Sequence, residues 1–447
     1  MSKTLRQSPS VQRMPSTLTR RGFLSAMGLS AATLAAAPIL SGCSTGDDGT
    51  NLSFSGPIDA VETNALFEKY AAEFEGANPG TTVTVGTNGA GNFDQWFQAR
   101  LAAKNAPDVL RSAPVAIGRY IANGGMLDIS DYLPDGYGEQ FNQTFWSQVS
   151  PQDGGIFGIP QTVSTIAIYY RRSMIEQVGA RIPTSPDDAW TWDEFIEISK
   201  EVKDVTGSYA FSYSWSAQGA YYWLPILYQH GGALVEDDLR TPAVVSDEAI
   251  SALEWTKSWF DQGLISPANS IQGTSGDDAL NLFTTEQVGM MVNGHWKLTN
   301  ARDSTLDPDD WDVTYLFRDV ETASMVGGSI VGVTRDVKNP ELATELAQTM
   351  CSEENMREFC AKTLFLPARN SLAEEGGVPW EFRPEVVDVF VQQSAAIPEA
   401  MYRLQTSPYF STINTAMGNE LGLCFTGQQS ASDTVANIAT VVEEAVA

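Results

Sequence analysis

Strand-like runs alternate with helix-like runs through most of this 447-residue chain, and this alternation limits its fold class more than any other feature. A predicted strand at residues 52–54 is followed by a helix at residues 62–75 that keeps its apolar side chains on one side. A break at residues 78–80 precedes a second strand at 81–85 and a second helix at 93–103. The alternation predicts an α/β fold in which helices are layered on sheets.

Later helix starts are marked by residues that cap the first turn. Thr191 and Glu194 have the spacing of a capping box, in which the side chain of each residue accepts a hydrogen bond from the backbone N–H of the other residue. The other predicted starts are at Ser246, Asn339 and Ser352.

The charge balance is strongly negative and unevenly spread. The chain has 27 Lys and Arg against 55 Asp and Glu, a formal charge of −28, yet residues 1–42 hold five basic residues and no acidic one. The rest of the chain therefore carries −33. This sign argues against a nucleic-acid partner, because phosphate binding needs a basic patch. The chain has only two histidines, His230 and His295, which argues against a His-rich zinc or copper site, so no metal or other cofactor is expected.

The N-terminal residues 1–42 have the order of a secretory signal. A basic segment precedes an uncharged run at residues 22–42, and Cys43 follows. Residues 19–24, Thr-Arg-Arg-Gly-Phe-Leu, resemble a twin-arginine export signal. Residues 40–43, Leu-Ser-Gly-Cys, resemble a bacterial lipobox, whose cysteine is lipidated and becomes the first mature residue. The alternative is an uncleaved membrane anchor, since 21 uncharged residues are long enough to span a bilayer.

The segment after the signal is polar. Residues 43–52 are rich in Ser, Thr, Gly and Asp, which predicts a flexible tether between the anchor and the folded body. No later stretch approaches 18 apolar residues, so a soluble body is expected.

Three cysteines remain beyond the lipobox. An odd number cannot pair fully, and their spacing does not suggest a metal site. One disulfide and buried free thiols both stay open. The residues are Cys351, Cys360 and Cys424.

Seven aromatic residues fall within residues 209–223. The alternation over residues 209–215 predicts a strand with four aromatic side chains on one face, and a buried sheet face is the expectation for Tyr209 and Phe211. The residues after this strand read as a loop with exposed rings beside Ser, Gln and Gly. Flat rings beside polar groups are what a sugar site needs. The aromatics expected in this exposed group are Trp215, Tyr221 and Tyr222.

Residues 293–296, Asn-Gly-His-Trp, place another aromatic after a buried-looking run at 288–292. Gly294 allows the chain to turn, and Trp296 follows at a predicted junction of loop and helix. Trp296 is a further candidate for stacking on a sugar, and a core tryptophan is the alternative.

Motifs of common hydrolases and nucleotide-binding proteins are missing. The sequence has no Gly-x-Ser-x-Gly elbow, no metalloprotease helix motif and no phosphate-cradling glycine loop. An exported glycosidase stays open, because it needs only two positioned carboxylates.

A series of short segments follows a specific order along nearly the whole mature chain. They lie at residues 67–85, 106–109, 158–171, 191–195, 283–296, 327–340, 366–369 and 409–427. They include Ala-Pro-Asp-Val at 106–109 and Leu-Pro-Ala-Arg at 366–369. In this order they resemble an extracellular solute-binding protein of a bacterial ABC importer, of the sugar-binding group that includes maltose-binding protein.

The resemblance implies a two-lobed, type II periplasmic-binding-protein-like fold. Two α/β lobes would be joined by hinge crossovers and would close on a ligand in the cleft. By analogy, the N-lobe comprises residues 53–162 plus 318–365, and the C-lobe comprises 163–317 plus 366–447.

The resemblance also implies ligand-binding positions. One departure argues against maltose itself: Ser112 stands where the maltose-binding protein has an aromatic platform. The implied positions are Tyr221, Trp296, Tyr409 and Phe410, with Asp94, Gln95, Gln161, Gly328 and Arg369.

Together these features predict a monomeric receptor, lipid-anchored through Cys43 to the outer face of the cytoplasmic membrane. It is expected to capture a neutral mono- or oligosaccharide by hinge closure and deliver it to the membrane permease subunits of an ABC importer, without catalysis. Trp296 and Tyr221 would stack on the sugar, while Asp94, Gln161 and Arg369 would bond hydroxyls. The alternatives are a receptor for an acidic sugar, polyamine or peptide, and a surface glycosidase.

Overall fold

Two β-sheets organise the part of the chain that the computed structural model describes, residues 49–58, 62–89, 93–150, 154–215, 219–269, 276–374 and 376–447. Both sheets belong to one compact unit. The export signal predicted at residues 1–42 and Cys43 lie outside the described residues. The strands are β1 (Asn51–Ile58), β2 (Thr82–Gly89), β3 (Val109–Ser112), β4 (Ile159–Ser164), β5 (Ile166–Arg171), β6 (Phe211–Tyr213), β7 (Met290–Gly294), β8 (Trp311–Thr314), β9 (Gly327–Val333) and β10 (Leu366–Pro367).

The six-stranded sheet has the order β10-β4-β9-β3-β1-β2, and the four-stranded sheet has the order β6-β7-β5-β8. In the first sheet β1 is parallel to β2 and β3, whereas β9 is antiparallel to β3 and β4. Every residue of β3, β4 and β5 is buried, which is typical of strands covered on both faces. The predicted α/β layering is therefore confirmed.

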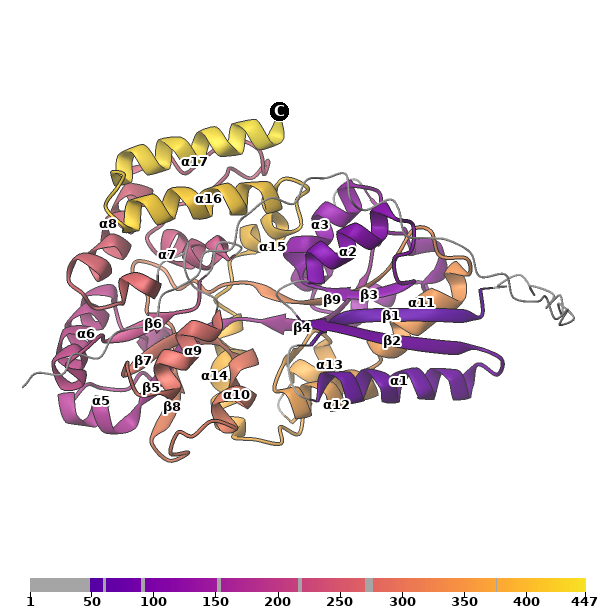
Figure 1. Ribbon diagram of the computed structural model, residues 1–447, viewed down its shortest axis with the longest axis horizontal. Helices are drawn as coiled ribbons and strands as arrows, with labels where there is room; N and C mark the ends of the chain where they lie inside the picture. The colour runs from indigo at the N-terminus through magenta and orange to yellow at the C-terminus, as the bar shows by residue number, and fades with distance from the viewer. Residues whose placement is uncertain are drawn as a thin grey trace, which may run out of the picture. The chain divides into compact units, whose positions relative to one another are not determined.

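Helices cover both faces of the six-stranded sheet. In Figure 1, α1 and α12 lie on one side of β1 and β2, and α2 and α3 lie on the other. The helices are α1 (Thr63–Ala77), α2 (Phe93–Ala102), α3 (Pro114–Ala122), α4 (Gln143–Trp146), α5 (Arg172–Val178), α6 (Trp192–Thr206), α7 (Leu224–Gln229), α8 (Asp247–Asp261), α9 (Gly276–Thr284), α10 (Leu298–Arg302), α11 (Pro340–Met350), α12 (Glu353–Thr363), α13 (Asn370–Ala373), α14 (Pro384–Ser394), α15 (Glu399–Gln405), α16 (Phe410–Phe425) and α17 (Ala431–Val446).

The predicted helix starts are confirmed where local side chains decide them. The Thr191 hydroxyl accepts from the Glu194 N–H at 3.2 Å, and the Glu194 carboxylate accepts from the Thr191 N–H at 2.9 Å, which completes the capping box of α6. The side chains of Ser246, Asn339 and Ser352 cap α8, α11 and α12 by accepting a hydrogen bond from the backbone N–H three residues further on.

Two crossover segments between the sheets lie side by side. Thr165 alone separates β4 from β5, and residues 315–326 lead back from β8 to β9. The Thr165 hydroxyl lies 2.6 Å from the hydroxyl of Ser324, which donates to the Ile166 carbonyl at 3.2 Å. Both side chains are fully buried, so this pair of hydrogen bonds ties the crossovers together.

The hydrophobic core of the four-stranded sheet is rich in aromatic side chains. Phe211, Tyr213 and Trp215 are fully buried there, and each packs against the ring of Trp259. The prediction that Trp215 is one of the exposed loop aromatics is therefore wrong, since the residue is part of the core. Its indole N–H donates to the Asn269 carbonyl at 2.6 Å, since the alternating inward pattern continues two residues past the end of β6.

The three described cysteines are free and buried. The structure therefore favours buried free thiols over a disulfide. Burial raises the pKa of the Cys351 thiol to about 12, which keeps it protonated and unreactive.

Candidate functional site

Four aromatic side chains from three distant segments form a cluster on the half of the molecule that holds the four-stranded sheet. We call Tyr221, Tyr222, Trp296 and Phe410 the aromatic cluster. The ring centroids are 4.7 Å apart for Tyr221 and Tyr222, 6.4 Å for Tyr222 and Trp296, and 6.4 Å for Tyr221 and Phe410. Phe410 is fully buried, whereas the other three are partly exposed. The cluster therefore has one buried member and three partly exposed members.

Local backbone geometry positions Trp296. Strand β7 ends at Gly294, and Trp296 lies in the 3-10 turn η7 (His295–Lys297) that follows. The indole folds back over Gly294 so closely that a Cβ at this glycine would lie 1.9 Å from the ring. Any side chain at position 294 would therefore displace Trp296.

The two tyrosines are carried by the 3-10 turn η5 (Ala220–Trp223). The Tyr221 N–H donates to the Asn414 side chain of α16 at 2.8 Å, and the Tyr222 carbonyl accepts from the Tyr213 hydroxyl at 2.9 Å. Burial raises the pKa of both Tyr221 and Tyr222, so their hydroxyls stay protonated at neutral pH. Each hydroxyl therefore remains a hydrogen-bonding group rather than an anion.

A polar group lies on the helices of the six-stranded sheet. Asp94, in the first turn of α2, accepts hydrogen bonds at Oδ1 from the Arg119 guanidinium and from the Tyr120 hydroxyl, the latter at 2.6 Å. The Asp94 side chain is 43% exposed and that of Arg119 is 32% exposed, so both reach solvent. Arg119 could not be recognised from the sequence, because no local pattern connects it with a carboxylate 25 residues away.

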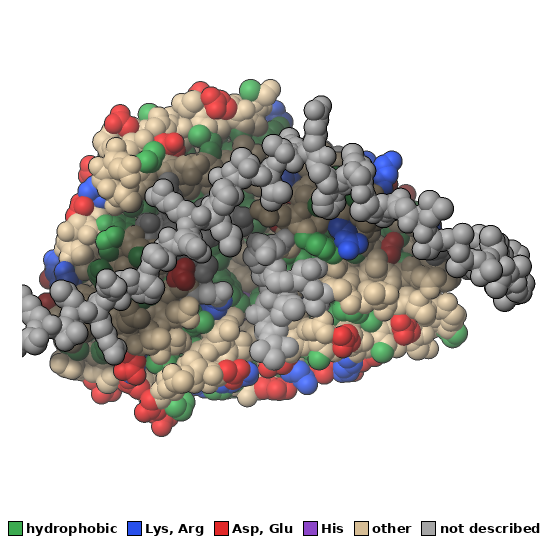
Figure 2. Space-filling model, in the orientation of Figure 1, with side chains coloured by type: hydrophobic (Ala, Val, Ile, Leu, Met, Phe, Trp, Pro, Cys, Tyr) green, Lys and Arg blue, Asp and Glu red, His purple; other side chains and the backbone are tan. Residues whose placement is uncertain are grey.

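The two halves of the molecule also contact each other directly. Val115, at the start of α3, packs against the hydrophobic core that also carries the aromatic cluster. The guanidinium of Arg302 in α10 lies 3.3 Å from the carboxylate of Glu62, which precedes α1. Figure 2 shows hydrophobic side chains in the hollowed middle of the visible face, with acidic side chains along its edges.

Two of the predicted ligand residues are bonded to other residues of the protein. The Gln161 amide accepts from Arg111 at 2.7 Å and donates to the Met350 carbonyl at 3.1 Å. The Arg369 guanidinium donates to the Cys351 carbonyl at 2.9 Å and to Gln140 at 2.5 Å. Both side chains are almost completely buried, so these bonds stabilise the fold.

The remaining predicted residues have different surroundings. Gly328 has φ +137°, and a Cβ there would lie 2.1 Å from the Thr162 carbonyl oxygen, so the backbone requires glycine. Gln95 is exposed in α2. Tyr409, just before α16, is partly exposed and lies under the Arg240 guanidinium at 5.6 Å.

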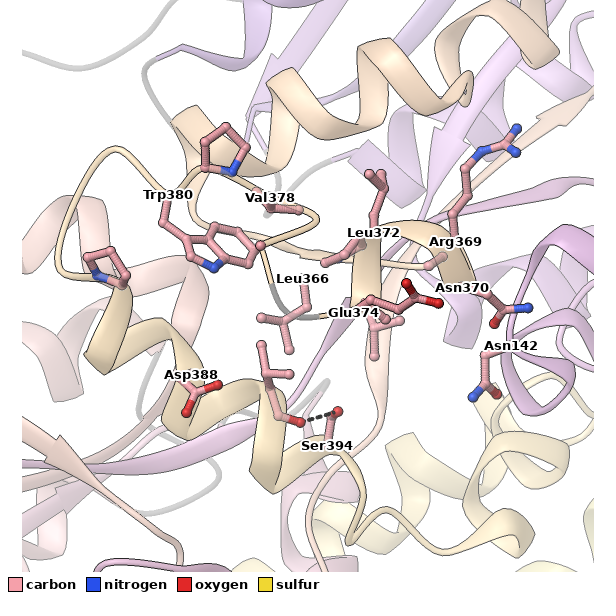
Figure 3. Close-up of a pocket in the computed structure, with 18 of the residues that line it drawn as sticks. Asn142, Leu366, Arg369, Asn370, Leu372, Glu374, Val378, Trp380, Asp388 and Ser394 are labelled. Carbon is pink, nitrogen blue, oxygen red and sulfur yellow. Dashed lines mark hydrogen bonds between the residues drawn. The ribbon is translucent and has the colours of Figure 1, made fainter.

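A cavity of about 860 Å³ lies elsewhere, between β10, α13 and α14. Leu366, Leu372 and Trp380 give it apolar walls, and Glu374 and Asp388 add carboxylates. Figure 3 shows the Arg369 guanidinium pointing away from Trp380 and Asp388. No member of the aromatic cluster lines this cavity.

His295, next to Trp296, predicts a measurable pH dependence. Burial lowers the pKa of His295 from its ordinary 6.5 to about 3, so the folded protein keeps the ring neutral while the unfolded chain takes up a proton below pH 6.5. The contribution of the neutral His295 ring to the free energy of unfolding is complete above pH 6.5 and is lost as the pH falls from 6.5 towards 3. We expect the free energy of unfolding to drop by about 2 kcal/mol more in the wild type than in His295→Gln between pH 8 and 5. Urea unfolding at both pH values measures these drops, and an equal drop in the two proteins would contradict this prediction.

Comparison with known families decides what kind of protein this is. The model of the bacterial extracellular solute-binding protein family matches residues 59–357. The chain belongs to this family. The extracellular solute-binding protein resembles the maltodextrin-binding protein of Bacillus subtilis, with 23% identity over 65% of this chain and 67% of the relative. It also resembles the maltooligosaccharide ABC transporter solute-binding lipoprotein of Streptococcus pneumoniae R6, with 22% identity over 68% of this chain and 69% of that protein.

Solved structures confirm the fold of this solute-binding protein. The GacH receptor of Streptomyces glaucescens, solved unliganded and with acarbose, matches with a TM-score of 0.74 and 20% identity over 88% of this chain and 98% of the receptor. The predicted type II periplasmic-binding-protein-like fold is therefore confirmed. Among the described residues, no helix combines the length and the apolar character that crossing a membrane requires.

Proposed function

We propose that this solute-binding protein is the receptor of a sugar ABC importer, which captures a neutral mono- or oligosaccharide and delivers it to permease subunits in the membrane. The observation that carries the proposal is the aromatic cluster, with partly exposed rings of Trp296, Tyr221 and Tyr222 beside neutral hydroxyls. Such rings match the C–H faces of a sugar, and the hydroxyls match its polar edge. The names of the relatives and the acarbose complex of GacH support a carbohydrate ligand.

Each half of the molecule supplies a different part of the proposed site. Trp296 and Tyr221 stack on the sugar, with Tyr222, Tyr409 and Phe410 beside them. On the opposite half, Asp94 accepts a sugar hydroxyl at Oδ2 while Arg119 holds its Oδ1, and Gln95 extends this polar edge. Gln161, Gly328 and Arg369 support the surrounding backbone.

Hinge closure would bring these parts together around the ligand. We propose lobes at residues 53–162 with 318–365 and at 163–317 with 366–447, which turn about the crossovers tied by Thr165 and Ser324, with the boundary strand β10 staying paired with β4 in the six-stranded sheet. A sugar that contacts both lobes only in the closed state shifts the equilibrium by its differential affinity. The receptor acts as a monomer and needs no catalytic group for this task.

A melting-temperature screen tests the ligand class. Maltodextrins, galacto-oligosaccharides and monosaccharides are compared with polyamines, peptides and uronic acids, because a ligand of the folded state raises the melting temperature. We expect a neutral sugar to give the largest shift, roughly 5 °C or more at saturation. A shift with polyamines or peptides alone would contradict the proposal, and release of products from any bound sugar would favour the glycosidase.

The anchor makes a separate prediction. Cys43 is the proposed lipidation site that holds the protein to the outer face of the cytoplasmic membrane after twin-arginine export. We expect Cys43→Ala to move the exported protein from the membrane fraction to the soluble fraction, because a lipid chain supplies the membrane affinity. Ser44→Ala is the matched control and should stay with the membrane. Unchanged membrane association of Cys43→Ala would favour an uncleaved anchor.

A further inference from the structure

His295 is buried at the base of the proposed sugar site, yet it has no place among the sugar contacts. It separates Gly294 from Trp296 and is fully buried, unlike His230, whose side chain is 28% exposed. A fully buried imidazole next to a binding-site tryptophan needs a physical explanation, because burying its polar atoms costs free energy.

One hydrogen bond connects the ring to the hinge. His295 Nε2 lies 3.1 Å from the Val163 carbonyl oxygen, 132 residues away in the chain. Val163 lies in β4, where it pairs with Gly328 of β9 and Leu366 of β10. Only Ser164 separates Val163 from Thr165, whose hydroxyl bonds Ser324 of the second crossover.

Three aromatic rings fix the orientation of the imidazole. The rings of Phe365, Phe390 and Trp296 stand nearly perpendicular to it, at centroid distances of 4.8, 5.8 and 5.5 Å. Phe365 precedes β10 of the six-stranded sheet, whereas Phe390 lies in α14. The imidazole therefore lies where parts of both halves meet.

The protonation state follows from these neighbours. Burial keeps the ring neutral with a single N–H, and the Val163 and Leu364 carbonyls both face it. Of these two carbonyls, only that of Val163 meets the geometry of a hydrogen bond, with Nε2, and Nδ1 makes no such bond within the described part of the chain. The proton therefore belongs on Nε2, where it donates to Val163.

We propose that His295 is a positioning residue. It fixes the position of the Trp296 indole relative to strand β4 through the hydrogen bond from its Nε2 to the Val163 carbonyl. The inference rests on the proposed function for its effect on sugar affinity, but the placement of Trp296 by His295 does not. A sugar that stacks on Trp296 is thereby mechanically connected to the hinge.

Two substitutions separate this hydrogen bond from mere packing. His295→Gln keeps an N–H donor at a reach close to that of Nε2, whereas His295→Leu keeps a similar length without the donor. In protein labelled with 5-fluorotryptophan, the ¹⁹F resonance of Trp296 is assigned with Trp296→Phe. We expect this resonance to move in His295→Leu and to stay near the wild-type position in His295→Gln. An unmoved resonance in His295→Leu, or equal shifts in both variants, would overturn the inference.

Sugar affinity provides the second readout in the same variants, with the library sugar that gives the largest melting shift. We expect about a tenfold loss in His295→Leu and a loss within about twofold in His295→Gln. If no sugar in the library binds the wild type, the proposed function fails, while the ¹⁹F result still decides the position of Trp296.

The wild type alone offers a test that does not depend on variant folding. A tag-free protein has two histidines, so ¹⁵N-labelled imidazole spectra contain two ring systems, and His230→Gln identifies the other one. We expect His295 to be the Nε2–H tautomer and to stay neutral from pH 8 to 5. An Nδ1–H tautomer, or a ring that protonates near pH 6.5, would overturn the inference.

Discussion

Trp296→Ala is expected to weaken sugar binding by about 100-fold, the loss typical of a central aromatic contact. The substitution removes the ring that meets Tyr222 at 6.4 Å, and with it the face on which the sugar is proposed to stack. Because Trp296 is partly exposed, we expect the melting temperature of the sugar-free protein to change little. Isothermal titration with the library sugar measures the affinity, and a melting curve without sugar measures the stability.

Tyr132→Ala is the matched control for this experiment. Tyr132 is an aromatic residue with 38% of its surface exposed, in the 3-10 turn η2 (Ser130–Tyr132) of the other half of the molecule. Its removal should leave the affinity within about twofold. Undiminished binding in Trp296→Ala would place the sugar outside the aromatic cluster, and an equal loss in both variants would indicate a non-specific effect.

Trp215→Ala is expected to show the opposite pattern, a large loss of stability with little change in affinity. Trp215 is fully buried, stacks on Phe425 at 5.4 Å and donates to the Asn269 carbonyl. Truncation removes this packing and leaves a cavity and an unpaired carbonyl, so the free energy of unfolding should fall by about 3–5 kcal/mol. Urea unfolding measures this difference in stability. Titration of the folded protein with the library sugar measures its affinity for the sugar.

Trp215→Phe is the milder companion for the case in which the alanine variant does not fold. It keeps most of the ring packing and removes the indole N–H, so we expect a smaller loss of about 1–2 kcal/mol. A variant of Trp215 that keeps its stability but loses the sugar would return this residue to the binding site.

Features encoded within a few residues of each other could be predicted from the sequence. The capping box of Thr191 and Glu194 depends on atoms three residues apart, so its pattern and its hydrogen bonds coincide. The helix starts at Ser246 and Asn339 are equally local. The ordered series of short segments indicated the family that the comparison then established.

The sequence could not separate binding aromatics from core aromatics. Trp215 and Tyr221 both stand near Ser, Gln and Gly in the sequence, yet the first is fully buried and the second is partly exposed. Burial depends on which distant helices cover a segment. In this case Phe425 of α16 and Trp259 of α8 pack against Trp215, and the sequence around Trp215 does not predict these contacts.

The sequence by itself determined the charge and the layering of this protein, because charge counts and hydrophobic periods are properties of neighbouring residues. Only the tertiary structure decided which side chains are available to a ligand. The polar atoms of Gln161 and Arg369 are bonded to residues as far away as Met350 and Gln140, and the ring of His295 to the carbonyl of Val163. Such bonds span 132 to 229 residues, and a partner at that distance exists only once the sheets have assembled.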